Sequence, residues 1–136
     1  MRIAVTGATG FVGGAVCQAL AFSGAPLAGI VSFHGSLVPV PSDAATKVKG
    51  KVLMCHGAID PFVKPEEVNA FMKALDDAKL DYQFISYAGA KHAFSNPEAD
   101  KLGPMNNLPL SYNAAADRRS WAHMQAFLAE VFATKK

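Results

Sequence analysis

The sequence predicts a three-layer α/β/α domain in which helices cover both faces of a four-stranded, mainly parallel sheet. Short apolar runs rich in β-branched residues alternate along the chain with segments of helical periodicity, and Gly or Pro marks most of the changeovers. Strands that alternate with helices form parallel sheets, and right-handed crossovers place the helices on both faces. The expected strands are residues 2–6, 27–33, 51–55 and 81–87, and residues 1–136 are expected to form a single domain.

Two of the three expected helices have clear boundaries. The first follows Gly13 and Gly14 and ends at Gly24, because glycine suits a helix C-terminus and Pro26 prevents continuation. The second opens at Pro65, with two acidic residues at the positive end of its dipole. Its apolar face is expected to consist of Val68, Phe71, Met72 and Leu75. Residues 36–50 lack periodicity and contain two prolines, so we expect a surface loop there.

The third helix closes the chain after a polar, proline-rich segment at residues 95–111. Asn113 is a suitable N-cap for this helix, and the two C-terminal lysines lie favourably at its negative end. Its apolar side is expected to contain Trp121, Met124, Phe127, Leu128, Val131 and Phe132, with His123 on the solvated side.

Net charge, apolar run lengths and cysteine spacing exclude several classes of function. The formal net charge is +2, and the basic residues are scattered rather than gathered in a stripe, so nucleic acid is not an expected partner. No apolar run is long enough to span a membrane, and no secretory signal pattern precedes the first strand. Cys17 and Cys55 lie in apolar contexts without metal or redox spacing. We therefore expect a cytoplasmic protein with no metal site, in which both cysteines are packed core residues.

Chemistry in a parallel sheet is expected beyond the carboxyl ends of its strands. The strand ends carry residues 6–13, His34 with Gly35, residues 56–60, and residues 89–92. The last two bring Asp60 and His92 to the same edge, where the carboxylate could orient the imidazole for hydrolysis. The chain order of nucleophile, acid and base is that of the α/β hydrolases. His34 and His56 are instead expected to finish their strands and to hydrogen-bond locally.

Several motifs resemble the C-terminal half of the dienelactone hydrolase family. They are GAPLAGIVSFHG at 24–35, KVLMCHGAIDPFV at 51–63, YAGAKHAFSNP at 87–97 and YNAAADRRSW at 112–121. The resemblance covers roughly residues 13–133. It implies half of an α/β-hydrolase fold, hydrolysis of a small ester or lactone through an acyl-enzyme, and catalytic roles for Asp60 as the acid and His92 as the base.

The chain departs from that family at the nucleophile. The family's turn reads Gly-x-Cys-x-Gly-Gly, and aligning its double glycine with Gly13 and Gly14 places Phe11 at the nucleophile position. A phenyl ring has no nucleophilic group, and Thr9 is the only hydroxyl residue within the turn. In many members an Arg shortly after the catalytic His binds a substrate carboxylate, whereas Ser95 and Asn96 occupy that neighbourhood here. We therefore expect weak or absent hydrolysis.

Residues 1–20 also resemble the start of an extended short-chain dehydrogenase or epimerase. Gly7, Gly10 and Gly13 have the spacing of a turn that lets a pyrophosphate approach a helix N-terminus. This predicts NAD(P) as an alternative ligand, although no acid follows the second strand to bind a ribose. A chain that combines two families at a shared strand–turn–helix is one hypothesis, and a purely structural chimeric domain is another.

The comparison with full-length members of the dienelactone hydrolase family predicts a homodimer. Full family members are about twice as long as this chain, and their additional strands flank the strand that corresponds to residues 2–6. Here that strand is expected to lie at a sheet edge, where unpaired backbone groups can recruit another chain. Pairing about a two-fold axis, through or beside this strand, is the expected solution.

Overall fold

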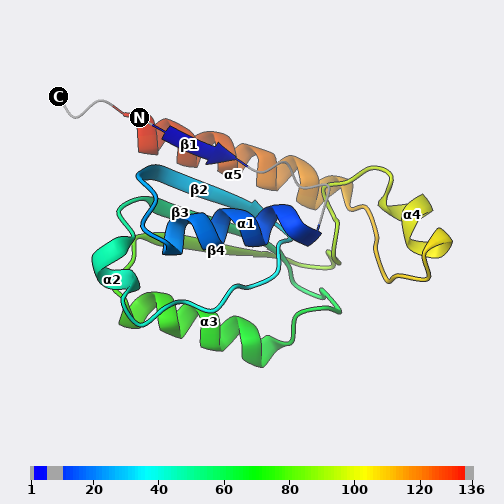
Figure 1. The fold of residues 1–136 in the computed structure, drawn as a ribbon. Helices are drawn as coiled ribbons and strands as arrows, with labels where there is room; N and C mark the ends of the chain where they lie inside the picture. Colours follow the sequence, from blue (N-terminus) through cyan, green and yellow to red (C-terminus); the bar gives the residue numbers. More distant parts are fainter. Residues whose placement is uncertain (1, 6–10, 134–136) are drawn as a thin grey trace.

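The fold is a parallel sheet between two helical layers (Figure 1). The computed structural model describes residues 2–5 and 11–133. Within these ranges the strands are β1 (Arg2–Val5), β2 (Leu27–Phe33), β3 (Lys51–Gly57) and β4 (Tyr82–Tyr87). They lie in the order β1-β2-β3-β4, and every neighbouring pair is parallel. The predicted α/β fold is confirmed, and β1 lies at an edge of this sheet.

Two apolar cores pack on opposite faces of the sheet, as the alternation of side chains along each strand requires. One core joins the sheet to α1 (Phe11–Phe22) and α3 (Pro65–Asp77), and the other joins it to α5 (Ala114–Phe132). In β3, Val52 and Met54 enter the first core while Leu53 and Cys55 enter the second. Because β2 and β3 are buried on both faces, they read as continuous apolar runs in the sequence.

The expected helix boundaries are largely confirmed. Gly24 adopts a positive φ of 86° directly after α1, a backbone conformation that glycine adopts without strain. At the start of α3, the Glu67 carboxylate accepts a hydrogen bond from the Lys64 backbone amide at 2.7 Å. Asn113 caps α5, since its side-chain oxygen accepts a hydrogen bond from the Ala116 amide.

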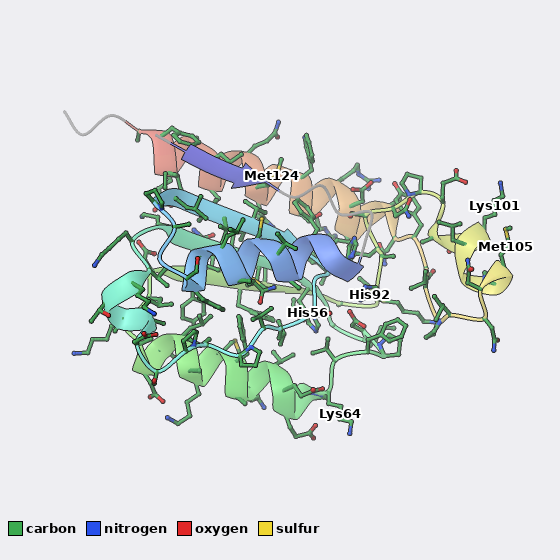
Figure 2. The ribbon with its side chains drawn as sticks, in the orientation of Figure 1. His56, Lys64, His92, Lys101, Met105 and Met124 are labelled. Carbon is green, nitrogen blue, oxygen red and sulfur yellow. The ribbon has the colours of Figure 1, made fainter. Side chains whose placement is uncertain are left out.

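The assignment of Trp121 to the apolar side of α5 is wrong. The buried stripe of this helix consists of Ala116, Ser120, Met124 and Phe127, spaced by three or four residues. Trp121 follows Ser120 by one position, which turns its side chain about 100° away from the stripe. Its side chain is accordingly 56% exposed. Figure 2 labels Met124 of α5 among the side chains packed beside the sheet.

Two further short helices form. α2 (Ala44–Lys47) lies within residues 36–50, which were expected to be a surface loop, and α4 (Ala99–Met105) lies within the polar, proline-rich segment 95–111. α4 contains Gly103 and Pro104; Gly103 is buried, and an added Cβ would lie 2.9 Å from the Leu108 carbonyl oxygen. Figure 2 shows α4, with Lys101 and Met105, projecting from the body of the protein. None of the helices in the described ranges is both long and apolar enough to cross a membrane.

Candidate active site

The loops that follow β3 and β4 form the base of the candidate site. The two strands pair in register up to Gly57 and Tyr87, so both loops begin at the same level. The amide of Ala58 then donates to the Tyr87 carbonyl at 2.9 Å, and the amide of Ile59 donates to the Ala90 carbonyl at 3.1 Å. These backbone hydrogen bonds bind the loop that carries the acid to the loop that carries the base.

Gly57 permits this close approach. A Cβ atom at Gly57 would lie 2.6 Å from the Ala90 carbonyl oxygen and 2.7 Å from the Lys91 carbonyl oxygen. These are backbone atoms, which cannot move aside as the end of a flexible side chain can. Glycine is therefore required at the end of β3 for the segment that leads to His92 to reach the Asp60 turn.

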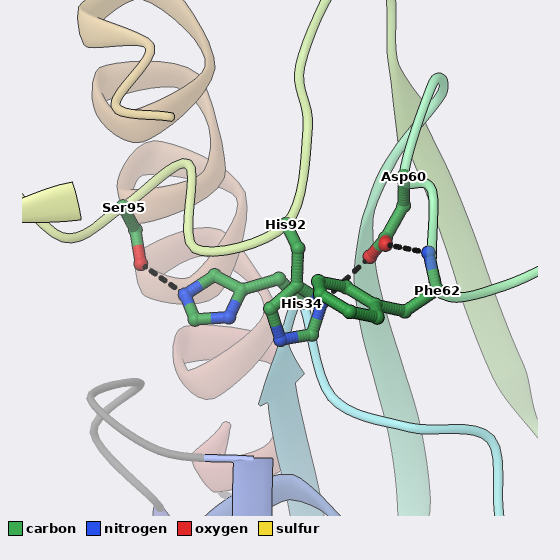
Figure 3. Close-up of polar contacts among 5 residues, drawn as sticks. All are labelled: His34, Asp60, Phe62, His92 and Ser95. Carbon is green, nitrogen blue, oxygen red and sulfur yellow. Dashed lines mark hydrogen bonds and ion pairs between the residues drawn. The ribbon is translucent and has the colours of Figure 1, made fainter. Parts of the chain in front are cut away.

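Asp60 and His92, the two predicted catalytic residues, lie side by side and are hydrogen-bonded (Figure 3). The Nδ1–H group of His92 donates to Oδ2 of Asp60 at 2.8 Å. The other carboxylate oxygen of Asp60 accepts a hydrogen bond from the Phe62 amide at 2.9 Å. The Asp60 side chain is fully buried, and the His92 side chain is only 6% exposed. A buried carboxylate with both oxygens engaged is well suited to hold an imidazole in one orientation.

The electrostatic environment keeps Asp60 ionised at neutral pH. Burial raises the pKa of its carboxyl group, because a charge is poorly solvated in the interior. The hydrogen bonds from His92 and from the Phe62 amide, together with attraction to the neighbouring imidazoles, outweigh this effect. The net result is a pKa of Asp60 below its ordinary value. The ionised carboxylate can therefore accept the Nδ1 proton of His92.

His34 is a third component of the site, and its side chain also bonds far beyond the local contacts expected for it. Its Nε2 atom shares a hydrogen bond of 3.0 Å with Oγ of Ser95, 61 positions away in the sequence. The ring lies edge-on to His92, with 5.3 Å between ring centroids (Figure 3). His34 also has a positive φ of 39°, a strained conformation for a residue other than glycine. Such strain occurs where surrounding contacts fix the backbone, often at functional sites.

His34 is neutral at physiological pH. Burial lowers the pKa of its imidazole to about 4, and the neighbouring His92 acts in the same direction. A neutral ring can pack against His92 without adding a second positive charge beside the candidate base. The sequence did contain a signal for His34, since it ends a strand at the same sheet edge, but its contact with Ser95 depends on a loop far along the chain.

The remaining histidines lie outside this group of hydrogen bonds. His56 is buried at the end of β3, with its ring 5.5 Å from that of Phe84, and burial lowers the pKa of its imidazole. His123 is exposed on α5, as expected, and its Nδ1 atom lies 2.8 Å from the hydroxyl of Tyr87. Within the part of the chain that the structure describes, no cluster of His, Cys, Asp and Glu could hold a metal ion.

The other predicted site residues belong to the glycine-rich turn. Gly7, Gly10 and the alternative nucleophile Thr9 lie outside the described residues. Gly13 falls in the first turn of α1, and Phe11 is the first residue of that helix. Since β1 pairs with β2 in parallel, with Val5 opposite Val31, it ends at the same sheet edge as the strands that precede Asp60 and His92. The strand before the glycine-rich segment and the helix after it are therefore at the expected place.

Helices on both faces of a parallel sheet, with an acid and a histidine at its carboxyl edge, form the framework of the α/β hydrolases. The chain belongs to the dienelactone hydrolase family, whose model matches residues 2–132. It is 32% identical over 132 residues to an uncharacterized protein of Caenorhabditis elegans, a match that covers 93% of this chain and 80% of that protein. The family model also covers residues 2–20. The resemblance of these residues to a dehydrogenase stays a prediction, and so does a chimeric origin of the chain.

Two solved structures are also similar. One is a dienelactone hydrolase-like promiscuous phosphotriesterase from metagenomic libraries, with 40% identity and a TM-score of 0.79. The other is the protein m3DLH, with 39% identity and a TM-score of 0.80. They are matched over 88% and 89% of this chain, but over only 48% and 49% of their own lengths. The chain thus spans about half the length of these structures.

Proposed function

We propose that the chain is an ester or lactone hydrolase of the dienelactone hydrolase type, in which Asp60 is the acid and His92 the base. The observation that carries this proposal is the buried hydrogen bond of 2.8 Å between His92 Nδ1 and Asp60 Oδ2. Family membership supports the reaction class, and the position of both residues beyond parallel strands supports their roles.

The chemistry follows from the proton on the imidazole. When Nδ1 donates to Asp60, the proton-accepting nitrogen of neutral His92 is Nε2. This nitrogen can take a proton from an attacking group, and the Asp60 carboxylate then stabilises the imidazolium that forms. Burial strengthens that stabilisation, because charges interact more strongly where water is excluded.

We further propose that the chain lacks the family's usual nucleophile and is therefore weakly active or inactive. The alignment of the double glycine places Phe11 at the nucleophile position. Neither cysteine is a good substitute, since Cys17 and Cys55 are both buried and burial raises the pKa of the Cys55 thiol to about 11. Hydrolysis would then require water to attack the carbonyl carbon directly, with His92 as general base.

Hydrolysis of p-nitrophenyl acetate, measured with His92→Ala and Asp60→Asn, tests this proposal. We expect slow hydrolysis in the unmodified chain and a loss of about 100-fold, or down to the uncatalysed rate, in His92→Ala. Asp60→Asn should also lower the rate, because an amide cannot stabilise the imidazolium. His123→Ala is a matched control, since His123 is an exposed histidine on α5. Activity that His92→Ala leaves unchanged would rule out His92 as the base.

A second candidate function is binding of NAD(P) at Gly7, Gly10 and Gly13. It is favoured by the position of this motif between β1 and α1, which is the strand–turn–helix context that such a fingerprint needs. Titration with NADH and NADPH, followed by nicotinamide fluorescence, tests this function. Saturable binding that Gly10→Val abolishes would support it, and no binding at millimolar cofactor would exclude it. If both assays are silent, a purely structural role is the remaining hypothesis.

A further inference from the structure

We propose that a groove beside His92 binds the apolar chain of a neutral substrate, such as an ester with an uncharged aliphatic acyl group. This inference rests on the proposed function, because it assigns a substrate class to the same site. The groove has a volume of about 470 Å³, which lies within the range of small-molecule sites. It runs between the segment that follows β2 and the first turns of α3.

The walls of the groove are mainly aliphatic and aromatic. The lining side chains include Leu37, Val38 and Val40 on one side, and Phe62, Ala70 and Phe71 on the other. Apolar chains are stabilised when such a surface removes them from water. A cavity of this composition therefore favours a hydrocarbon chain over a polar group.

Polar groups at the groove are already engaged with the protein. The Ser36 carbonyl accepts a hydrogen bond from Gln18 Nε2 at 2.7 Å, and the Val38 amide donates to Gln18 Oε1 at 2.9 Å. Gln18 is fully buried in α1, so these bonds hold one wall of the groove in place. On the other wall, Glu67 accepts a hydrogen bond from the Lys64 amide. A preformed wall reduces the entropy that a ligand must lose on binding.

The groove adjoins the candidate active site at Phe62. This residue lines the groove, and its ring lies edge-on to His92 with 5.1 Å between ring centroids. Figure 3 shows the Phe62 ring beside the imidazole of His92. In Figure 2, His92 is labelled near one end of the sheet and Lys64, the N-cap of α3, below it. A chain in the groove would therefore bring its carbonyl group toward His92.

Charge favours a neutral chain. Among the described residues that line the groove, Glu67 alone has an ionisable side chain, and its charge would repel a carboxylate. The substrate class assigned here is therefore a neutral acyl chain without a free carboxylate.

Titration with hexanamide, followed by two-dimensional ¹H–¹⁵N NMR, tests the groove without requiring turnover. Hexanamide has a neutral six-carbon chain and an amide in place of the ester. Adipamic acid is the matched anionic probe, because it has the same chain length and ends in a carboxylate. We expect saturable shifts at residues 37–40 and 62–71 with hexanamide, and at least about tenfold weaker binding of adipamate.

Ala70→Phe should fill the groove and weaken hexanamide binding by about tenfold or more. Asn69→Phe is the matched control, because Asn69 is exposed on α3 and does not line the groove. Shifts of the unmodified chain that map elsewhere, or equal binding of both probes, would overturn the assignment even if Ala70→Phe failed to fold. Hexanamide binding in the groove without ester hydrolysis would support the groove and show that the chain is inactive rather than weakly active.

Discussion

The two halves of the active-site edge differ in how firmly the sheet holds them. On one side, β3 has neighbours on both sides, and its pairing with β4 continues without interruption from Val52 to Gly57. On the other side, β1 has one neighbour among the described strands, and its register with β2 shifts between Arg2 and Ala4. The paired acid and base follow the regular half, whereas the family's nucleophile position follows the irregular half.

This difference lets the two parts of the candidate machinery be tested separately. Backbone hydrogen bonds between the β3 and β4 loops support the hydrogen bond between Asp60 and His92. The predictions below test that separation, beginning with the largest expected effect.

Supplying a thiol at the nucleophile position should produce the largest change. If the acid–base pair is competent, Phe11→Cys should raise hydrolysis of p-nitrophenyl acetate by roughly 10³-fold, about 4 kcal/mol of transition-state stabilisation. The gain arises because a thiolate attacks the carbonyl carbon far better than water does. Single-turnover kinetics with mass spectrometry of the acyl-enzyme would measure it.

The control for this gain is the double variant Phe11→Cys with His92→Ala. The thiol alone should react slowly, so most of the increase should disappear in the double variant. An equal rate with and without His92 would show that the new thiol acts independently of the acid–base pair. A silent Phe11→Cys variant that is correctly folded would contradict the alignment of Gly13 and Gly14 with the family's double glycine.

Gly57→Ala should destabilise the half of the active-site edge that β3 and β4 form. Its Cβ would lie 2.6 Å from the Ala90 carbonyl oxygen, so the backbone of one loop must move. We expect a loss of about 3 kcal/mol in the free energy of unfolding, measured by urea denaturation. Gly89→Ala is a useful comparison because nothing lies within 4 Å of its added Cβ, although its φ of 71° disfavours alanine. A smaller loss at Gly57 than at Gly89 would refute this account of the loop contact.

The neutral state of His34 predicts a pH-dependent stability. The folded-state pKa of about 4 lies below the ordinary value of 6.5, so between these values the unfolded chain binds more protons than the folded chain. Stability should therefore be complete above pH 6.5 and should fall by about 2 to 3 kcal/mol as the pH decreases to about 4. Urea denaturation at pH 7 and pH 4.5, compared with His34→Gln, would measure this contribution.

Two other groups also contribute to the pH dependence of stability. Burial lowers the pKa of His56, so this residue contributes in the same direction below pH 6.5. Asp60 has a lowered pKa, and its contribution is lost at more acidic pH, as the pH falls through its folded-state value. His34→Gln should therefore reduce, but not remove, the loss of stability between pH 6.5 and 4. An unchanged loss would mean that His34 is protonated in the folded chain.

Local sequence patterns were sufficient to predict the α/β framework and the juxtaposition of Asp60 and His92. Asp60 follows the continuous apolar run of β3, and His92 follows the next strand, β4, at the same sheet edge. In a parallel sheet, the chain direction alone brings these ends together. The positions of Phe71 and Leu75 were predictable for a similar reason, because helical periodicity marks the buried face of α3.

Other features depend on contacts between distant segments. The bond from His34 to Ser95 requires the loop after β4 to fold back over the end of β2, which no local pattern indicates. The exposure of Trp121 depends on which side of α5 meets the sheet, and its large apolar side chain suggested the wrong side. In the helix α4, the Gly103 backbone packs closely against the Leu108 carbonyl, a contact that the local sequence does not indicate.

Disrupting the proposed homodimer should have the smallest effect on the stability of the protomer. β1 lies at the sheet edge, and α1, which connects it to β2, exposes Val16 and Leu20 one helical turn apart. We expect a second copy to pair through or beside β1, and Val16→Glu to weaken that association. Because Val16 is 46% exposed, its replacement should change the free energy of protomer unfolding by less than about 0.5 kcal/mol. Sedimentation equilibrium at tens of micromolar measures the association. A monomeric unmodified chain would contradict the dimer. A dimer that Val16→Glu dissociates without loss of protomer stability would locate the contact beside β1, at the irregular half of the sheet.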